Sequence, residues 1–177
     1  MGVLRSADVL NSATNKSLLA YWLRLSGEGG VPQREHFDPV DLEPEVLPHI
    51  FLCSLGHAPF SVHFRLQGTF ITEHLGQNYT GKELNDETFG TAAATVLDLY
   101  KQVAYGEHPV VSQELVSAAN GDEILIEVLH MPLMNRQGKV AFILGSIDAV
   151  GDDYLNKKHF VSHHWSIKST TELGLDI

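Results

Sequence analysis

The sequence predicts an α+β fold in which a five-stranded antiparallel sheet carries helices on one face. Two β-rich runs precede a helical middle section, three follow it, and short turn sequences join neighbouring strands. With 177 residues, 44% of them apolar, the chain is long enough for one well-buried core. We expect a single domain with an N-terminal helix and proline-rich cap (1–49), a core (50–150) and a C-terminal tail (151–177).

The N-terminal part is expected to begin with a helix over 12–25, which Gly27 ends. Four apolar residues recur there at helical spacing: Leu18, Tyr21, Trp22 and Leu25. Four prolines interrupt the following stretch, 31–48, and predict extended pieces and single helical turns. Asp38 before Pro39 is typical of a capped first turn.

Two strands are expected to open the core. The apolar run 50–55 suits a buried strand, and 61–67 alternates strictly between apolar and polar residues. This alternation predicts that one set faces the helices and the other faces away from them. The inward set is Val62, Phe64 and Leu66, and the outward set is His63, Arg65 and Gln67.

The middle section predicts two helices. A short one covers 69–75 and stops at Gly76, and the longest helix of the chain runs over 88–105 to Gly106. One face of the long helix is apolar: Ala92, Val96, Leu99, Tyr100 and Val103.

Three strands complete the predicted sheet, over 110–119, 123–133 and 139–150. A tight turn at Asn120-Gly121 joins the first two, and the turn at 135–138 makes a hairpin of the last two.

The segment GQNYTGKEL, 76–84, resembles a phosphate-binding loop but has Glu83 where a Ser or Thr is required. It follows a predicted helix instead of a buried strand, and a carboxylate at that place would repel phosphate. We therefore expect no nucleotide site, and assign Gly76 to a helix cap and Gly81 to a turn.

Composition limits the classes of partner. The formal charge of −10 argues against nucleic acid and anionic membrane surfaces. Cys53 is the single cysteine, so no internal disulfide can form. This count is consistent with a protein in a reducing compartment. The longest apolar runs, such as 140–145, are far too short to span a bilayer. We expect a cytoplasmic protein.

A chain of short motifs in order resembles a small PAS-like family found mainly in alphaproteobacteria as freestanding proteins. The motifs are Tyr21-Trp22, Pro32, Asp38-Pro39, Leu47-Pro48, Phe64-Arg65-Leu66, Gly68-Thr69, Gly76, Thr80-Gly81 and Met131-Pro132-Leu133. The resemblance covers about 15–148 and implies a sensor-type module whose five-stranded sheet cups a small pocket against the middle helices. It names no ligand or cofactor, because PAS domains bind haem, flavins, metabolites or nothing.

A ligand pocket in such a fold would draw on apolar side chains that a filled core would use equally. Our candidates are Phe64, Leu66, Phe70, Tyr100, Val128 and Leu144. Asp148 resembles the acidic residue through which many PAS domains couple to a following helix, although Val150 replaces the usual Thr.

Specific cofactor chemistry finds little support. Cys53 lies on a predicted strand, away from the setting of a flavin-reactive cysteine, and reads as a small buried residue. His74 is the one histidine placed for a haem. His159 and His163 would share a helix face, with His164 beside them, but two lysines oppose a cation there, so we predict no metal site.

Enzymatic residues would have to converge on a pocket. The outward His63 and Arg65, and Glu127 near His130 on a central strand, are the candidates, and we predict no catalytic site.

The sequence therefore favours a non-catalytic cytoplasmic regulatory module that binds a small ligand, a signalling protein or both. The predicted N-terminal helix offers a contact for a homodimer. Two alternatives stay open: a ligand-free interaction scaffold, and a small α+β enzyme of the cone-shaped isomerase type.

Overall fold

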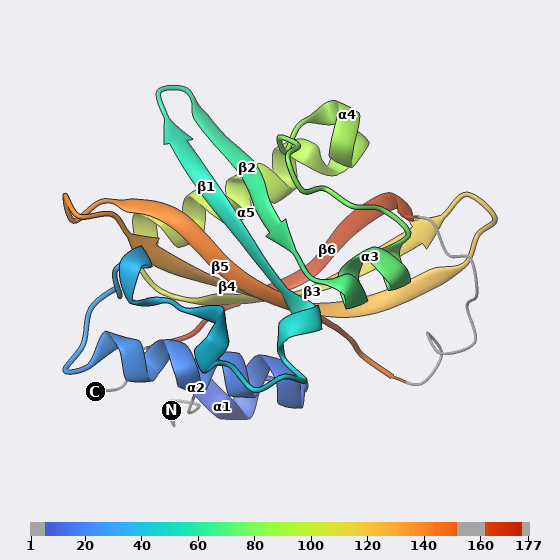
Figure 1. The fold of residues 1–177 in the computed structure, drawn as a ribbon. Helices are drawn as coiled ribbons and strands as arrows, with labels where there is room; N and C mark the ends of the chain where they lie inside the picture. Colours follow the sequence, from blue (N-terminus) through green and yellow to red (C-terminus); the bar gives the residue numbers. More distant parts are fainter. Residues whose placement is uncertain (1–5, 152–161, 175–177) are drawn as a thin grey trace, which may run out of the picture.

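The computed structural model describes residues 6–151 and 162–174, which form an antiparallel sheet with helices on both faces (Figure 1). The described part contains six strands in the order β2-β1-β5-β4-β3-β6. Their bounds are β1 Ile50–His57, β2 Phe60–Gln67, β3 Val110–Ala118, β4 Glu123–Met134, β5 Val140–Ala149 and β6 Ser162–Glu172. Every pair of neighbouring strands is antiparallel, as predicted.

The prediction of five strands is wrong, because β6 pairs with β3 along the edge of the sheet. This strand comes from the segment that we expected to be a tail with histidines on a helix. The backbone of His163 lies in β6, the exposed His164 follows it there, and His159 lies outside the described residues. Within 6–151 and 162–174, no group of three or more His, Cys, Asp or Glu side chains could hold a metal ion.

The helices fall into an N-terminal and a middle group. Their bounds are α1 Ser6–Val9, α2 Ala13–Ser26, α3 Thr69–Leu75, α4 Asp86–Phe89 and α5 Ala93–Gly106. Single 3-10 turns occupy Arg34–His36, Pro39–Asp41, Leu47–His49 and Gly90–Ala92. The turns within 31–48 confirm the prediction from the prolines, and Asp38 caps its turn by accepting a hydrogen bond from the Val40 amide. No helix in the described ranges is long and apolar enough to cross a membrane.

The expected long helix over 88–105 is broken at Gly90. This residue has φ +55° and ends α4, and a 3-10 turn separates it from α5. A positive φ is incompatible with a continuous right-handed helix. The apolar face of α5 is nevertheless buried as predicted.

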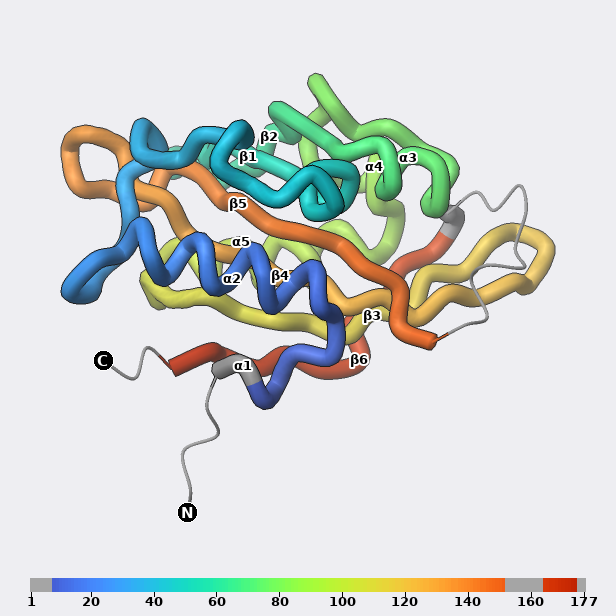
Figure 2. Tube along the Cα trace, turned by 60° about the horizontal axis from the view of Figure 1, so that its bottom comes forward, coloured from blue at the N-terminus to red at the C-terminus, as the bar shows by residue number. Residues whose placement is uncertain are grey.

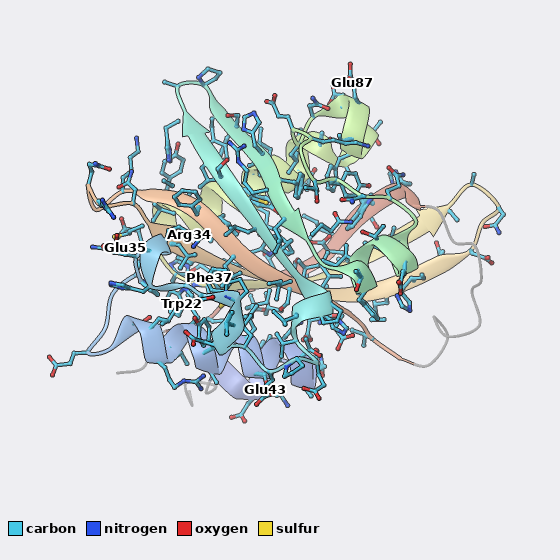
Figure 3. All side chains as sticks on the ribbon, in the orientation of Figure 1. Trp22, Arg34, Glu35, Phe37, Glu43 and Glu87 are labelled. Atoms are coloured by element: carbon cyan, nitrogen blue, oxygen red, sulfur yellow. The ribbon has the colours of Figure 1, made fainter. Side chains whose placement is uncertain are left out.

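Both faces of the sheet are covered, whereas the sequence predicted helices on one face only. The middle helices α3, α4 and α5 contribute to the core on one face, and α2 packs on β4 and β5 on the other (Figure 2). Trp22 and Phe37 lie in the layer between α2 and the sheet (Figure 3). The Trp22 indole N–H donates to the Pro132 carbonyl at 2.9 Å.

This arrangement corrects the expected dimer contact. Leu18, Tyr21 and Trp22 are buried, and Leu25 packs against the same core cluster. The apolar side of α2 is therefore covered by its own sheet and is not free to meet a second copy of the chain.

A β-bulge in β2 corrects the inward and outward assignment of its last residues. The pairing with β1 shifts between Leu52 and Cys53, so that Arg65 has no partner in the ladder. An extra residue reverses the alternation beyond it. Val62 and Phe64 face the core as predicted, but Leu66 is 40% exposed and Gln67 turns toward the middle helices.

The segment that resembles a phosphate-binding loop serves the fold. Gly76, with φ +72°, caps α3, and the Gly81 amide donates to the Phe64 carbonyl at 2.8 Å. Glu83 forms an isolated bridge to His63 on β2. The segment thus lies along the outer edge of β2, and Gly76 caps a helix as predicted.

We predict that Gly68→Ala lowers the free energy of unfolding by about 3 kcal/mol. A Cβ at Gly68 would collide with the carbonyl group of Pro48, which belongs to rigid backbone. Urea denaturation measures the change. Gly174→Ala is the control, because its Cβ would meet no atom within 4 Å. Equal stability of the two variants would contradict this close approach.

Candidate functional site

A cavity of about 30 Å³ lies between the sheet and the middle helices. This volume is room for about two water molecules. Its walls are mainly aromatic and aliphatic, with a few polar groups among them. The lining residues are Phe51, Phe64, Gln67, Ile71, Leu75, Tyr79, Phe89, Val96, Tyr100, Glu114, Val128, His130, Ile147 and Trp165.

The structure brings three of the six predicted pocket residues to this cavity, namely Phe64, Tyr100 and Val128. Leu66 lies on the outer side because of the bulge in β2. Whether the cavity binds a ligand stays a prediction.

Phe70 and Leu144 also lie elsewhere. On α3, Ile71 and Leu75 point to the cavity, while Phe70 stacks between His49 and His74 at centroid distances of 3.9 and 4.0 Å. Leu144 belongs to the core under α2. Strand β5 is buried on both faces, so its continuous apolar run could not show which residues point which way.

Glu114 is the buried carboxyl of the cavity, and the sequence analysis missed it. It is 3% exposed and accepts a hydrogen bond from the Ser112 hydroxyl at 2.5 Å. Burial raises the pKa of Glu114 to about 7, although the bond from Ser112 lowers it. The available signal was its register: Glu114 shares a face of β3 with Val110 and Val116, both buried.

His130 supplies a second polar group. Its ring is 2% exposed and lies edge-on to Phe51 and Tyr100, and its Nδ1 has no hydrogen-bond partner among the described residues. Burial lowers the pKa of His130 to about 3, so the imidazole is neutral at pH 7.

Cys53 is buried, as predicted, with its Sγ 3.8 Å from the Tyr100 hydroxyl. Burial raises the pKa of the Cys53 thiol to about 12, and also raises the pKa of Tyr100. Both groups are therefore protonated and neutral at pH 7, and Cys53 is not a reactive thiolate.

An aromatic cluster forms part of the cavity wall. It consists of Phe64, Tyr79, Phe89 and Trp165, with ring centroids of Phe89 5.1 to 5.9 Å from those of the other three. Phe89 comes from the four-residue helix α4, and Trp165 from β6. In Figure 3 Glu87 projects outward from the same short helix.

On the opposite face of the sheet, the carboxylate of Glu127 holds the N-terminus of α2. Glu127 is fully buried on β4 and accepts five hydrogen bonds of 2.9 to 3.1 Å. Two come from the amides of Asn11 and Ser12, and three from the side chains of Asn11, Asn15 and Gln113. Burial opposes ionisation, but these bonds outweigh it and lower the pKa of Glu127.

A polar network extends this contact, and we call Ser12, Asn15, Glu127, Ser146 and Asp148 the helix anchor. The buried Ser146 hydroxyl donates to Asn15 Oδ1 at 2.5 Å, and the Ser12 hydroxyl donates to Asp148 Oδ2 at 2.7 Å. Ser12 is also the N-cap of α2, accepting from the Asn15 amide. The anchor therefore joins α2 to β4 and β5.

Asp148 thus contacts a helix that precedes the sheet, whereas its resemblance implied coupling to a helix that follows. Its second oxygen, Oδ1, lies 3.7 Å from His49 Nδ1. Residues 152–161 lie outside the described part of the chain.

The helix anchor and the cavity are placed back to back on two neighbouring strands. Gln113 and Glu127 point to α2, whereas their chain neighbours Glu114 and Val128 point to the cavity. Glu127 and His130 consequently lie on opposite faces and do not converge as an acid and base. His63 and Arg65 point outward, to Glu83 and Ser54 respectively, and His74 lies outside the cavity.

Together, the antiparallel sheet and the cavity between it and the middle helices define a small α+β domain. A family model described as a PAS domain matches residues 10–148. The chain belongs to this PAS domain family.

Three solved structures resemble the chain at low sequence identity. No curated protein matches it. The PAS domain of BvgS from Bordetella pertussis is 14% identical with a TM-score of 0.47, covering 80% of this chain and 93% of that one. A light-oxygen-voltage domain studied with a flavin analogue is 18% identical with a TM-score of 0.45, covering 63% and 84%. VqmA of Vibrio cholerae, described as a DNA-binding receptor, is 17% identical with a TM-score of 0.46, covering 60% and 48%.

We predict that Glu127→Gln lowers the free energy of unfolding by about 3 kcal/mol at pH 7, because an amide cannot replace a carboxylate that accepts five hydrogen bonds. Since folding lowers the pKa of Glu127, its contribution is present above about pH 4.5 and is lost as the pH falls further. Hydrogen exchange should show faster opening of α2.

The control for this variant is Glu123→Gln, at an exposed position of the same strand. Its stability and its exchange in α2 should match the wild type. Unchanged protection of α2 in Glu127→Gln would contradict the role of the helix anchor.

We predict a separate pH dependence from Glu114, whose pKa is raised by folding from about 4.5 to about 7. Below pH 4.5 the carboxyl is protonated in both states. Above it the unfolded chain releases the proton first, so stability falls by about 3 kcal/mol by pH 8. Glu114→Gln should lack this decline in urea denaturation across the range, while Glu73→Gln, on the exposed surface of α3, should keep it.

Proposed function

We propose that this chain is a cytoplasmic, non-catalytic sensor module, in which occupancy of the cavity by a small ligand is relayed through the helix anchor to a protein partner. The PAS family is one of sensory and signalling modules, which supports the class. The single observation that carries the proposal is the back-to-back placement of the cavity and the anchor. One peptide unit separates Glu114 from Gln113, and another separates Val128 from Glu127.

The relay has a physical basis in the stiffness of a strand. A side chain displaced on one face of β3 or β4 shifts the backbone that also positions its neighbour on the other face. The side chains of the anchor are joined by hydrogen bonds of 2.5 to 3.0 Å, whose strength falls steeply as their geometry is disturbed. A ligand would thereby change how firmly the N-terminus of α2 is held.

We treat residues 1–177 as one domain, because α2 and the proline-rich segment complete the core on one face of the sheet. A homodimer stays a prediction, and it would have to use another surface than the buried side of α2. The negative charge still argues against nucleic acid, although a similar structure belongs to a DNA-binding receptor.

An interaction scaffold with a filled core is the second candidate. The observation in its favour is the cavity volume of about 30 Å³, since pockets for drug-sized ligands have about 300 to 1,000 Å³. The alternative of an isomerase-type enzyme is less favoured, because its candidate acid and base, Glu127 and His130, lie on opposite faces of the sheet.

Native mass spectra of the freshly purified full chain, with an absorbance scan of the same sample, test the proposal. We predict a bound compound that adds mass to the wild-type protein. Val128→Ile adds one methylene to the cavity wall and should reduce the bound fraction at least fivefold.

Val111→Ile is the matched control, because Val111 is buried under α2 on the other face of the sheet. It should retain the bound compound. A spectrum without added mass in all three proteins would reject the sensor proposal and favour the scaffold. Equal loss from both variants would place the bound compound outside the cavity.

A further inference from the structure

Glu114 is a buried carboxyl that has no cation beside it. None of the ion pairs in the described part of the chain includes it, and within that part its carboxyl accepts a hydrogen bond from Ser112. Burying a carboxyl in apolar surroundings without a counter-charge is unfavourable. The ionised form of Glu114 therefore lacks a positive charge beside it in the cavity.

The other residues around the cavity do not supply the missing charge. His130 is neutral, Gln67 and Tyr100 are neutral, and the remaining lining is apolar or aromatic. On the helices that cover the cavity, the charged side chains of Glu73, Asp98 and Lys101 do not line it. Every formal charge that the lining can carry at neutral pH is thus negative and belongs to Glu114.

We propose that the cavity binds a small molecule that has an apolar body and a protonated nitrogen, which donates its N–H groups to the carboxylate of Glu114. This inference rests on the proposed sensor function and adds the charge and polarity of the ligand. The aromatic walls suit the apolar body, and neighbouring aromatic faces attract a cation. A carboxylate or phosphate ligand would place a second negative charge beside Glu114 in a medium of low dielectric constant.

Two further observations support a positively charged ligand. The pKa of Glu114 lies close to 7, so a cation can hold the group ionised at little cost. His130, whose Nδ1 atom lacks a hydrogen-bond partner among the described residues, lines the same cavity. It offers a second polar contact to a ligand bound at Glu114.

The cavity is too small for an organic ligand unless a lining side chain moves. Since 30 Å³ holds about two waters, an organic ligand needs the space of at least one lining side chain. Phe89 is the best placed, because its ring packs against three aromatic neighbours and it belongs to the short helix α4. Phe89→Ala supplies such space without touching Glu114, and Val96→Ala supplies less space at lower cost in stability.

The experiment compares three probes of one shape and different charge: benzylamine, benzyl alcohol and benzoate. Their dissociation constants are measured at pH 7 by calorimetry and by NMR titration of the full chain, for the wild type, Phe89→Ala and Val96→Ala. We expect benzylamine to bind the enlarged cavity about tenfold tighter than benzyl alcohol, and benzoate to bind weakest. Adding Glu114→Gln should abolish the preference for the amine, while Glu73→Gln should leave it unchanged.

Tighter binding of benzyl alcohol or benzoate than of benzylamine would overturn the inference, and so would an amine preference that survives Glu114→Gln. Either result would leave the sensor function standing, because a ligand still occupies the cavity. Absence of binding by all three probes to folded Phe89→Ala and Val96→Ala would also overturn it. The sensor function fails by a different result, the absence of any bound mass in the freshly purified wild type.

Discussion

The structure depends on one buried charge, the carboxylate of Glu127, which is shared between the central strand β4 and the start of α2. An isolated carboxylate removed from water costs several kcal/mol, and this cost is offset only where nearly all its lone pairs are used. The five hydrogen bonds to Glu127 meet that requirement. Because two of them come from backbone amides at the positive end of the helix, the charge also fixes where α2 begins. The position of Trp22 and the proline-rich cap on the sheet follows from that starting point.

Glu114 and Glu127 show how environment divides two carboxyls that lie on neighbouring strands. Glu127 has several donors, which keep it ionised, whereas Glu114 has one hydroxyl and apolar walls, which favour the neutral acid. The two carboxyls point to opposite faces of the sheet, because the side chains of successive residues in a strand alternate between faces. A change in the state of Glu114 therefore occurs one residue from Gln113, which donates to Glu127. Under the proposed function, this proximity is the shortest route from ligand to helix.

Sequence patterns predicted best those elements that local chemistry determines. The helix α2, its N-cap region and the turns between prolines follow from spacing, capping and fixed φ, and all are present. The errors arose where tertiary pairing decides. The bulge at Arg65 moved Leu66 outward, and β6 exists because β3 offers it an edge. Leu144 was misplaced for another reason, because a strand that is apolar on both faces carries no directional signal. Glu114 was recognisable as a charge on an apolar face, but not as the polar centre of a cavity.

The small volume of the cavity constrains how a ligand could act. Strands β3 and β4 are each hydrogen-bonded on both sides, and β4 is also held by the anchor. The four-residue helix α4, by contrast, ends at Gly90 and carries Phe89 into the cavity. A single helical turn that pairs with no strand opens at lower free energy than strands paired on both sides. Under the proposed function, space for a ligand would therefore be gained on the side of α4, while the strands would receive the ligand's polar contact at Glu114. Entry and relay would then involve opposite walls of one cavity, so residues that admit a ligand need not be those that transmit its presence.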